Sequence, residues 1–213
     1  MEITRIFDIL DRYQSTYPEQ NVALAGKVNK EWIKYSPKEY FDIVQNISYA
    51  LIKLGINVGD KVGIISNNRP EWNLLDMATM QIGAISVPIY PTITAKEYQY
   101  ILNHAEVKLV LIEGAELMEK MISIKSELPL LQHIYTIVDR EKFPYLNQLI
   151  ELGEQNPNPE ELSIRKQNVL PESCCTIMYT SGTTGVPKGV MLSHKNIVNQ
   201  ILNLRQTPAK WSK

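Results

Sequence analysis

The stretch that decides the fold is VGIISNNRPEWNLLDMATMQIGAISVPI, residues 62–89. Its first part, Val62–Ser66, is a short apolar run bounded by turn residues, which is typical of a buried strand. A helical pattern follows from Pro70 to Ile82, and Ala84–Ile89 is a second apolar run. A strand, a helix and another strand in this order predict a β-α-β unit with parallel strands.

The same alternation continues in both directions along the chain. Capping boxes formed by Ser36 with Glu39 and by Thr94 with Glu97 mark two helix starts, and Ser193 is expected to cap the last helix. The breaker-rich stretch from Gly153 to Glu161 is expected to be an exposed connector. We therefore predict an α/β fold with parallel-sheet-rich β-α layers and helices on both faces. Further helices are expected at residues 4–17, 115–127 and 144–153, and further strands at 21–24, 31–35, 108–113, 134–138, 174–179 and 189–192.

The bulk composition excludes several classes of partner. The 213 residues are 44% hydrophobic and 21% charged with a net charge of −1, so no overall field favours nucleic acid or an anionic membrane. No apolar run reaches the length of a membrane-spanning helix, and the first residues lack the features of a secretory signal. We expect a cytoplasmic chain with at most peripheral membrane contact. Its adjacent cysteines, Cys174 and Cys175, are expected to point to opposite faces of a strand rather than to pair.

The chemistry-bearing segment follows the strand 174–179. Gly182, Gly185 and Gly189 let the backbone approach anionic oxygens closely. The segment also supplies hydroxyl donors and a positive charge for the outer phosphates of a nucleotide. These donors are Thr180, Ser181, Thr183, Thr184 and Lys188.

The common nucleotide-binding patterns do not fit this segment. The pattern G-x-x-x-x-G-K-[ST] requires glycine where Pro187 stands and serine or threonine where Gly189 stands. The dinucleotide fingerprint G-x-G-x-x-G does not occur in the chain. The simplest kinase, GTPase and dehydrogenase interpretations are therefore excluded.

Residues 177–188, Ile-Met-Tyr-Thr-Ser-Gly-Thr-Thr-Gly-Val-Pro-Lys, resemble at all twelve positions the AMP-binding signature of the adenylate-forming superfamily. That superfamily includes acyl-CoA synthetases, firefly luciferases and peptide-synthetase adenylation domains. Residues 67–72 and 83–92 resemble the early region of its long-chain fatty acyl-CoA synthetase branch. By this resemblance, residues 1–213 are the N-terminal portion of the AMP-binding large domain. The rest of that domain and the small C-terminal domain are absent from the sequence.

The resemblance implies a reaction in two steps, with ATP, Mg²⁺ and coenzyme A as cofactors and co-substrates. A fatty carboxylic acid is joined to the α-phosphate of ATP, and the acyl group then passes to coenzyme A. Lys188 is the implied catalytic residue, and Thr180 is the implied metal ligand. We expect small-molecule partners rather than nucleic acid, and we expect residues 1–213 to be incompetent alone. The implied nucleotide-binding residues are Thr180, Ser181, Gly182, Thr183, Thr184, Gly185 and Lys188.

Other interpretations remain open at this stage. The parent enzyme could activate an aryl or amino acid instead, or the chain could be a non-catalytic nucleotide-binding module, and a homodimer is compatible with the sequence. His104 is expected near a helix end and His194 in structural packing rather than proton transfer. The carboxylates Glu113, Glu116 and Glu119 are interpreted as a solvated loop and helix start, not as an acid–base pair.

Overall fold

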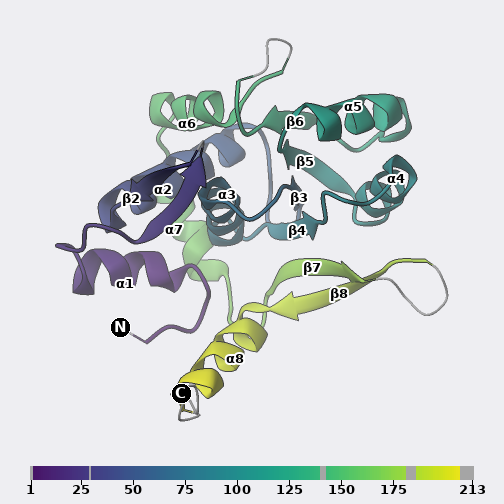
Figure 1. Ribbon diagram of the computed structural model, residues 1–213. Coiled ribbons are helices and arrows are strands. Elements are labelled where there is room, and N and C mark those ends of the chain that lie inside the picture. Colours follow the sequence, from purple (N-terminus) through teal and green to yellow (C-terminus); the bar gives the residue numbers. More distant parts are fainter. Residues whose placement is uncertain (1, 29, 140–142, 181–185, 207–213) are drawn as a thin grey trace, which may run out of the picture.

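The computed structural model describes residues 2–28, 30–139, 143–180 and 186–206, and strands and helices alternate along most of its length (Figure 1). The helices are α1 (Asp8–Thr16), α2 (Pro37–Lys53), α3 (Pro70–Gln81), α4 (Ala95–His104), α5 (Ala115–Ile124), α6 (Leu146–Gln155), α7 (Pro159–Asn168) and α8 (His194–Gln206). A 3₁₀ turn, Lys125–Glu127, follows α5. The strands are β1 (Leu24–Val28), β2 (Glu31–Tyr35), β3 (Lys61–Ile65), β4 (Ile85–Ile89), β5 (Val107–Ile112), β6 (His133–Thr136), β7 (Cys174–Thr180) and β8 (Lys188–Ser193).

Six of the strands form one sheet in the order β6-β5-β3-β4-β7-β8. All neighbours pair in parallel except β8, which is antiparallel to β7. The strands β1 and β2 form a separate antiparallel hairpin. The predicted α/β fold is confirmed. The sequence does not predict that β8 pairs in the antiparallel direction, because an extended pattern alone does not reveal the direction of a strand.

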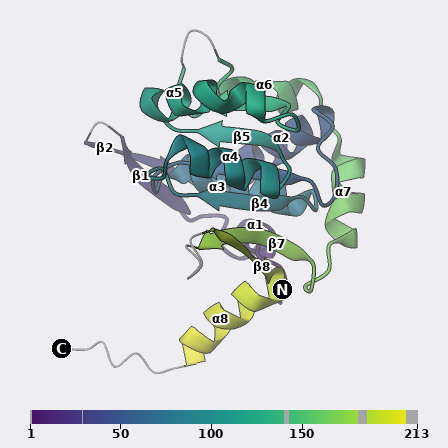
Figure 2. The same ribbon diagram turned by 90° about the vertical axis from the view of Figure 1, so that its right-hand side faces the viewer.

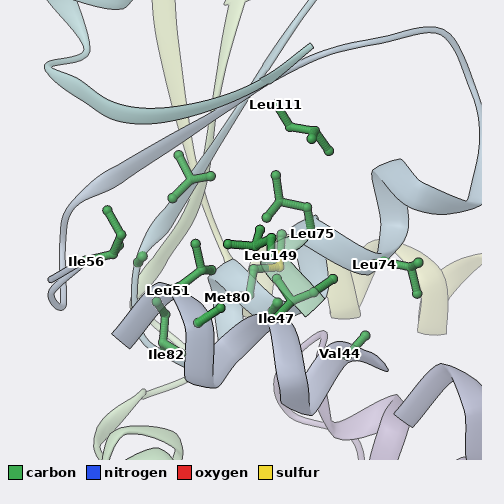
Figure 3. Close-up of a cluster of buried hydrophobic side chains, with 14 of the residues drawn as sticks. Val44, Ile47, Leu51, Ile56, Leu74, Leu75, Met80, Ile82, Leu111 and Leu149 are labelled. Carbon is green, nitrogen blue, oxygen red and sulfur yellow. The ribbon is translucent and has the colours of Figure 1, made fainter. Parts of the chain in front are cut away.

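Helices cover both faces of the sheet (Figures 1 and 2). Side chains of α1, α2, α3 and α6 form one hydrophobic core, and those of α4 and α5 form a second core on the opposite face. In the first core, Ile47 and Leu51 of α2 lie close to Leu75 of α3 and Leu149 of α6 (Figure 3). All four are fully buried, and each such side chain contributes about 1.5–3 kcal/mol through burial.

The predicted helix caps are present. Ser36 and Glu39 satisfy each other's backbone amides at the start of α2, and Thr94 and Glu97 do the same at the start of α4. Ser193 Oγ accepts the amide of Asn196, 3.2 Å away, at the start of α8. Each cap satisfies backbone donors that the first helical turn leaves without intrahelical partners.

The stretch from Gly153 to Glu161 differs from the exposed connector that the sequence predicts. The helix α6 continues through Gln155 and α7 begins at Pro159, so only residues 156–158 join the two helices. Asn158 caps α7 by accepting the amide of Glu161, and Pro159 occupies the first turn. Asparagine and proline therefore start a helix here instead of prolonging a loop.

The carboxyl ends of the parallel strands gather at one edge of the sheet. After β3 the chain adds β4 on one side and then β5 on the other. In open α/β sheets, ligands commonly bind at the carboxyl ends of the strands beside such a reversal. Because β7 runs parallel to β4, its last residue, Thr180, lies at this edge. None of the helices in the described ranges is long and apolar enough to cross a membrane.

Candidate functional site

The hairpin of β7 and β8 places two of the predicted nucleotide-binding residues opposite each other. Thr180 is the last residue of β7, Lys188 is the first residue of β8, and the two are register partners. Directly opposed residues of an antiparallel pair project from the same face, so their side chains are neighbours. Both residues are exposed. A hydroxyl donor and an ammonium group thus stand together at the carboxyl edge of the sheet, where an anion can reach them.

The other predicted ligands lie between these two positions. Ser181, Gly182, Thr183, Thr184 and Gly185 fall outside the described residues. Their assignment to nucleotide phosphates stays a prediction from the sequence.

An aromatic contact joins this hairpin to the end of α4. The imidazole Nδ1 of His104 lies 2.7 Å from the hydroxyl of Tyr179, the residue before Thr180. The Tyr100 ring stacks on His104 with centroids 5.3 Å apart. His104 is exposed in the last turn of α4, as its sequence position predicts. The hydrogen bond to Tyr179 is a feature that the sequence does not reveal, because the two residues are 75 positions apart.

Glu113 is not the solvated loop carboxylate that the sequence suggests. It follows β5 at the carboxyl edge and accepts hydrogen bonds from the Ser66 hydroxyl at 3.1 Å, the Asn67 amide at 2.7 Å and the Arg69 guanidinium at 2.9 Å. Burial by itself would raise the pKa of Glu113, but these donors outweigh it and the pKa is lowered. The parallel pairing of β3 with β5 brings the ends of the two strands together, so these donors surround Glu113. Glu116 and Glu119 are exposed, as predicted.

His194 is a packing residue in this structure. Its side chain is buried, its Nδ1 accepts the backbone amide of Ile6 at 3.3 Å, and its ring meets the Phe7 ring edge-on at 5.4 Å. Burial, assisted by the nearby charge of Arg5, lowers the pKa of His194 to about 4. A neutral imidazole that accepts a backbone hydrogen bond explains the position without proton transfer.

The predicted metal ligand, Thr180, has an exposed hydroxyl but no acidic cluster accompanies it. Among the residues that the structure describes, no group of three histidine, cysteine or acidic side chains could hold a metal ion. The assignment of Thr180 as a metal ligand stays a prediction from the sequence.

Comparison with known proteins assigns the chain to a family. The family model described as AMP-binding enzyme matches residues 10–212. Fatty acyl-CoA synthetase A of Dictyostelium discoideum is 38% identical over 195 residues, which are 84% of this chain and 27% of that protein. Long-chain-fatty-acid–CoA ligase ACSBG2 of Xenopus laevis is 36% identical over 182 residues, which are 83% of this chain and 24% of that protein. The chain thus spans about a quarter of the length of these relatives.

Solved structures agree with this assignment. The anthranilate CoA ligase AuaEII in complex with anthranoyl-AMP is 26% identical, with a TM-score of 0.73 over 90% of this chain and 35% of that one. A long-chain-fatty-acid-CoA ligase from Archaeoglobus fulgidus shares the fold at 22% identity, with a TM-score of 0.75 over 96% of this chain and 40% of that one. The chain belongs to the AMP-binding enzyme family, and the curated relatives that it resembles are fatty acyl-CoA ligases.

Proposed function

We propose that this chain binds the phosphates of ATP as part of an enzyme that activates fatty carboxylic acids and ligates them to coenzyme A. Its membership of the AMP-binding enzyme family and the names of its relatives support this reaction class. The observation that carries the proposal for the site is the opposition of Thr180 and Lys188 at the carboxyl edge of the sheet.

The proposed chemistry explains why a cation and hydroxyl donors are needed there. A carboxylate oxygen attacks the α-phosphorus of ATP, the bond between the α-phosphorus and the bridging oxygen breaks, and pyrophosphate leaves with an added negative charge. The thiol of coenzyme A then attacks the acyl carbon, the bond between that carbon and the phosphate oxygen breaks, AMP leaves, and the thiol proton is released to solvent. Lys188 would stabilise the charge that develops on the departing pyrophosphate, since a fixed positive charge acts most strongly where charge accumulates.

The remaining proposed contacts come from the same segment. Thr180 would donate its hydroxyl or ligate the metal, and Ser181, Gly182, Thr183, Thr184 and Gly185 would supply further donors to the phosphates. Magnesium, when bound, would supply positive charge to the phosphates.

A binding experiment on the chain tests the proposal for Lys188. Calorimetry in which ATP and magnesium are titrated into the purified chain should give measurable binding. The Lys188→Ala variant should bind ATP about tenfold more weakly, since a charge-assisted contact to phosphate is lost. The matched control is Lys195→Ala, which removes an exposed lysine of α8 that pairs with Glu172. Equal affinities of the wild type and Lys188→Ala would contradict the proposed role.

The complete reaction needs a separate test. Because the relatives are about four times as long, we propose that residues 1–213 alone do not release pyrophosphate from ATP with a fatty acid. Pyrophosphate release by the purified chain would overturn this statement. Product analysis across fatty, aryl and amino acids, with a longer protein that contains this chain, would test the acid class.

A further inference from the structure

Three side chains connect α4 to the hairpin that carries Thr180 and Lys188. We name the group Tyr100, His104 and Tyr179 the aromatic latch. The Tyr179 hydroxyl and His104 Nδ1 are 2.7 Å apart, and their rings meet edge-on with centroids 5.8 Å apart. Tyr100, one helical turn before His104, stacks on the imidazole at an interplanar angle of 24°. Stacking on Tyr100 within α4 thus fixes the orientation of the His104 ring that contacts the hairpin.

The latch acts on both strands of the hairpin directly beside the two site residues. Tyr179 precedes Thr180, and its register partner Gly189 follows Lys188. A Cβ atom on Gly189 would lie 3.2 Å from Cζ of Tyr179 and 2.9 Å from Cγ2 of Ile177, so the tyrosine ring covers the glycine. Any movement of Tyr179 therefore moves Thr180 and removes the packing over the start of β8.

The site residues lie at the margin of the sheet. Among the described strands, β8 is the edge strand and pairs with β7 alone. The register pair of Ser86 with Thr176 puts Ile89, the last residue of β4, level with Tyr179, so Thr180 lies just past the end of β4. Because Lys188 stands on an edge strand, a side-chain contact from α4 to the hairpin has a large influence on the position of this pair.

Tyr179 also makes apolar contacts. Its side chain is half-buried and packs against the second hydrophobic core, so the ring is held by this packing as well as by the hydrogen bond to His104.

We propose that His104 is a positioning residue that holds Thr180 and Lys188 in register through its hydrogen bond to Tyr179. The functional part of this inference rests on the proposed function of the hairpin, whereas the structural part does not. His104 itself is not expected to contact ATP.

Hydrogen exchange and ATP binding together test the latch. In Tyr179→Phe and His104→Phe, backbone amides near Thr180 and Lys188 should exchange about tenfold faster, while those of β3 and β5 should be unchanged. ATP affinity should fall about three- to tenfold in both variants. His104→Asn, whose side-chain amide replaces the Nδ1 position, should recover a large part of both effects. The double variant should be no worse than either single variant, since both remove the same contact.

The control is Tyr98→Phe, which removes a different hydroxyl of α4, the one that donates to the Tyr90 carbonyl at 3.0 Å. It should leave exchange in β7 and β8 unchanged. If exchange in the hairpin is the same in Tyr179→Phe as in the wild type, or if both effects are additive in the double variant, the latch is refuted. If exchange accelerates as expected but the wild type does not bind ATP, the latch stands and the proposed function fails.

Discussion

At the scale of single residues, Asp76 is a carboxyl group buried in the interior of the protein. It lies on α3 in the core with only 6% of its surface exposed, and its Oδ1 has no hydrogen-bond partner among the described residues. Burial raises the pKa of Asp76 to about 7, although the Ser86 hydroxyl favours the charged form. An ionised carboxylate at this position costs folding free energy above neutral pH.

We therefore predict that Asp76→Asn stabilises the protein in a pH-dependent way. At pH 8 the variant should gain about 4 kcal/mol in the free energy of unfolding, because the pKa of Asp76 is raised from 3.8 to about 7 and each pKa unit corresponds to about 1.4 kcal/mol. At pH 4.5 the gain should fall to about 1 kcal/mol, since the carboxyl is then protonated in the folded state while the unfolded carboxyl is still largely ionised. Urea unfolding at the two pH values measures the difference. The control is Asp42→Asn, which removes an exposed ion pair with Lys38. It should change the free energy of unfolding by under about 0.5 kcal/mol.

At the scale of elements, the sequence predicts most helices and strands from local signals. The capping boxes at Ser36 and Thr94 place the starts of α2 and α4 correctly, because capping is a local hydrogen-bonding event. The helix α7 is missed although Asn158 and Pro159 carry a start signal, since the surrounding breaker residues favour a loop.

Local sequence patterns do not predict which distant segments of the chain contact each other. The antiparallel direction of β8, the network on Glu113 and the contact of His104 with Tyr179 each depend on tertiary placement. For the candidate site, the sequence supplies the segment and its residue types. It does not show that Thr180 and Lys188 are register partners or what supports them.

The close packing of α6 on α2 gives a prediction at the same scale. A Cβ atom on Gly153 would overlap the backbone carbonyl of Asn46. Alanine would gain about 1 kcal/mol in intrinsic helix propensity, but overpacking against a backbone that cannot rotate away costs more. Gly153→Ala should therefore lower the free energy of unfolding by about 2 kcal/mol, measured by urea denaturation. Glu151→Ala, an exposed change on the same helix, should have little effect. A stabilised Gly153→Ala would show that the two helices can separate freely.

At the scale of the whole molecule, His194 ties the first residues of the chain to α8. Its Nδ1 accepts the Ile6 amide, and Arg5 donates to the carbonyls of Lys166 and Val169. The N-terminal segment, α7 and α8 thus share one contact region. Protonation of His194 would remove the acceptor for Ile6 and place a second positive charge near Arg5.

The two buried titratable groups act on stability in opposite directions as the pH falls. For His194 the folded pKa of about 4 is below the unfolded value of 6.5, so the unfolded state takes up the proton first and stability is lost between pH 6.5 and 4. For Asp76 the folded pKa of about 7 is above the unfolded value of 3.8, so the folded state takes up the proton first and stability is gained over the same range. The two contributions offset each other in the wild type.

Because His194 and Asp76 have opposite effects, the free energy of unfolding of the wild type should depend little on pH. That of Asp76→Asn should fall as the pH falls. Between pH 7 and 4.5 the free energy of unfolding of Asp76→Asn should fall by about 2 kcal/mol, since only the contribution of His194 remains. Adding His194→Asn, whose Oδ1 can accept the Ile6 amide in place of Nδ1, should remove that slope. Urea midpoints of the three proteins at half-unit pH steps measure the profile. The window stops at pH 4.5 because carboxylates with a lowered pKa, such as Asp8 and Glu113, lose their contributions below it. A slope of the same size in Asp76→Asn with and without His194→Asn would assign the pH dependence to other groups and remove His194 from this role.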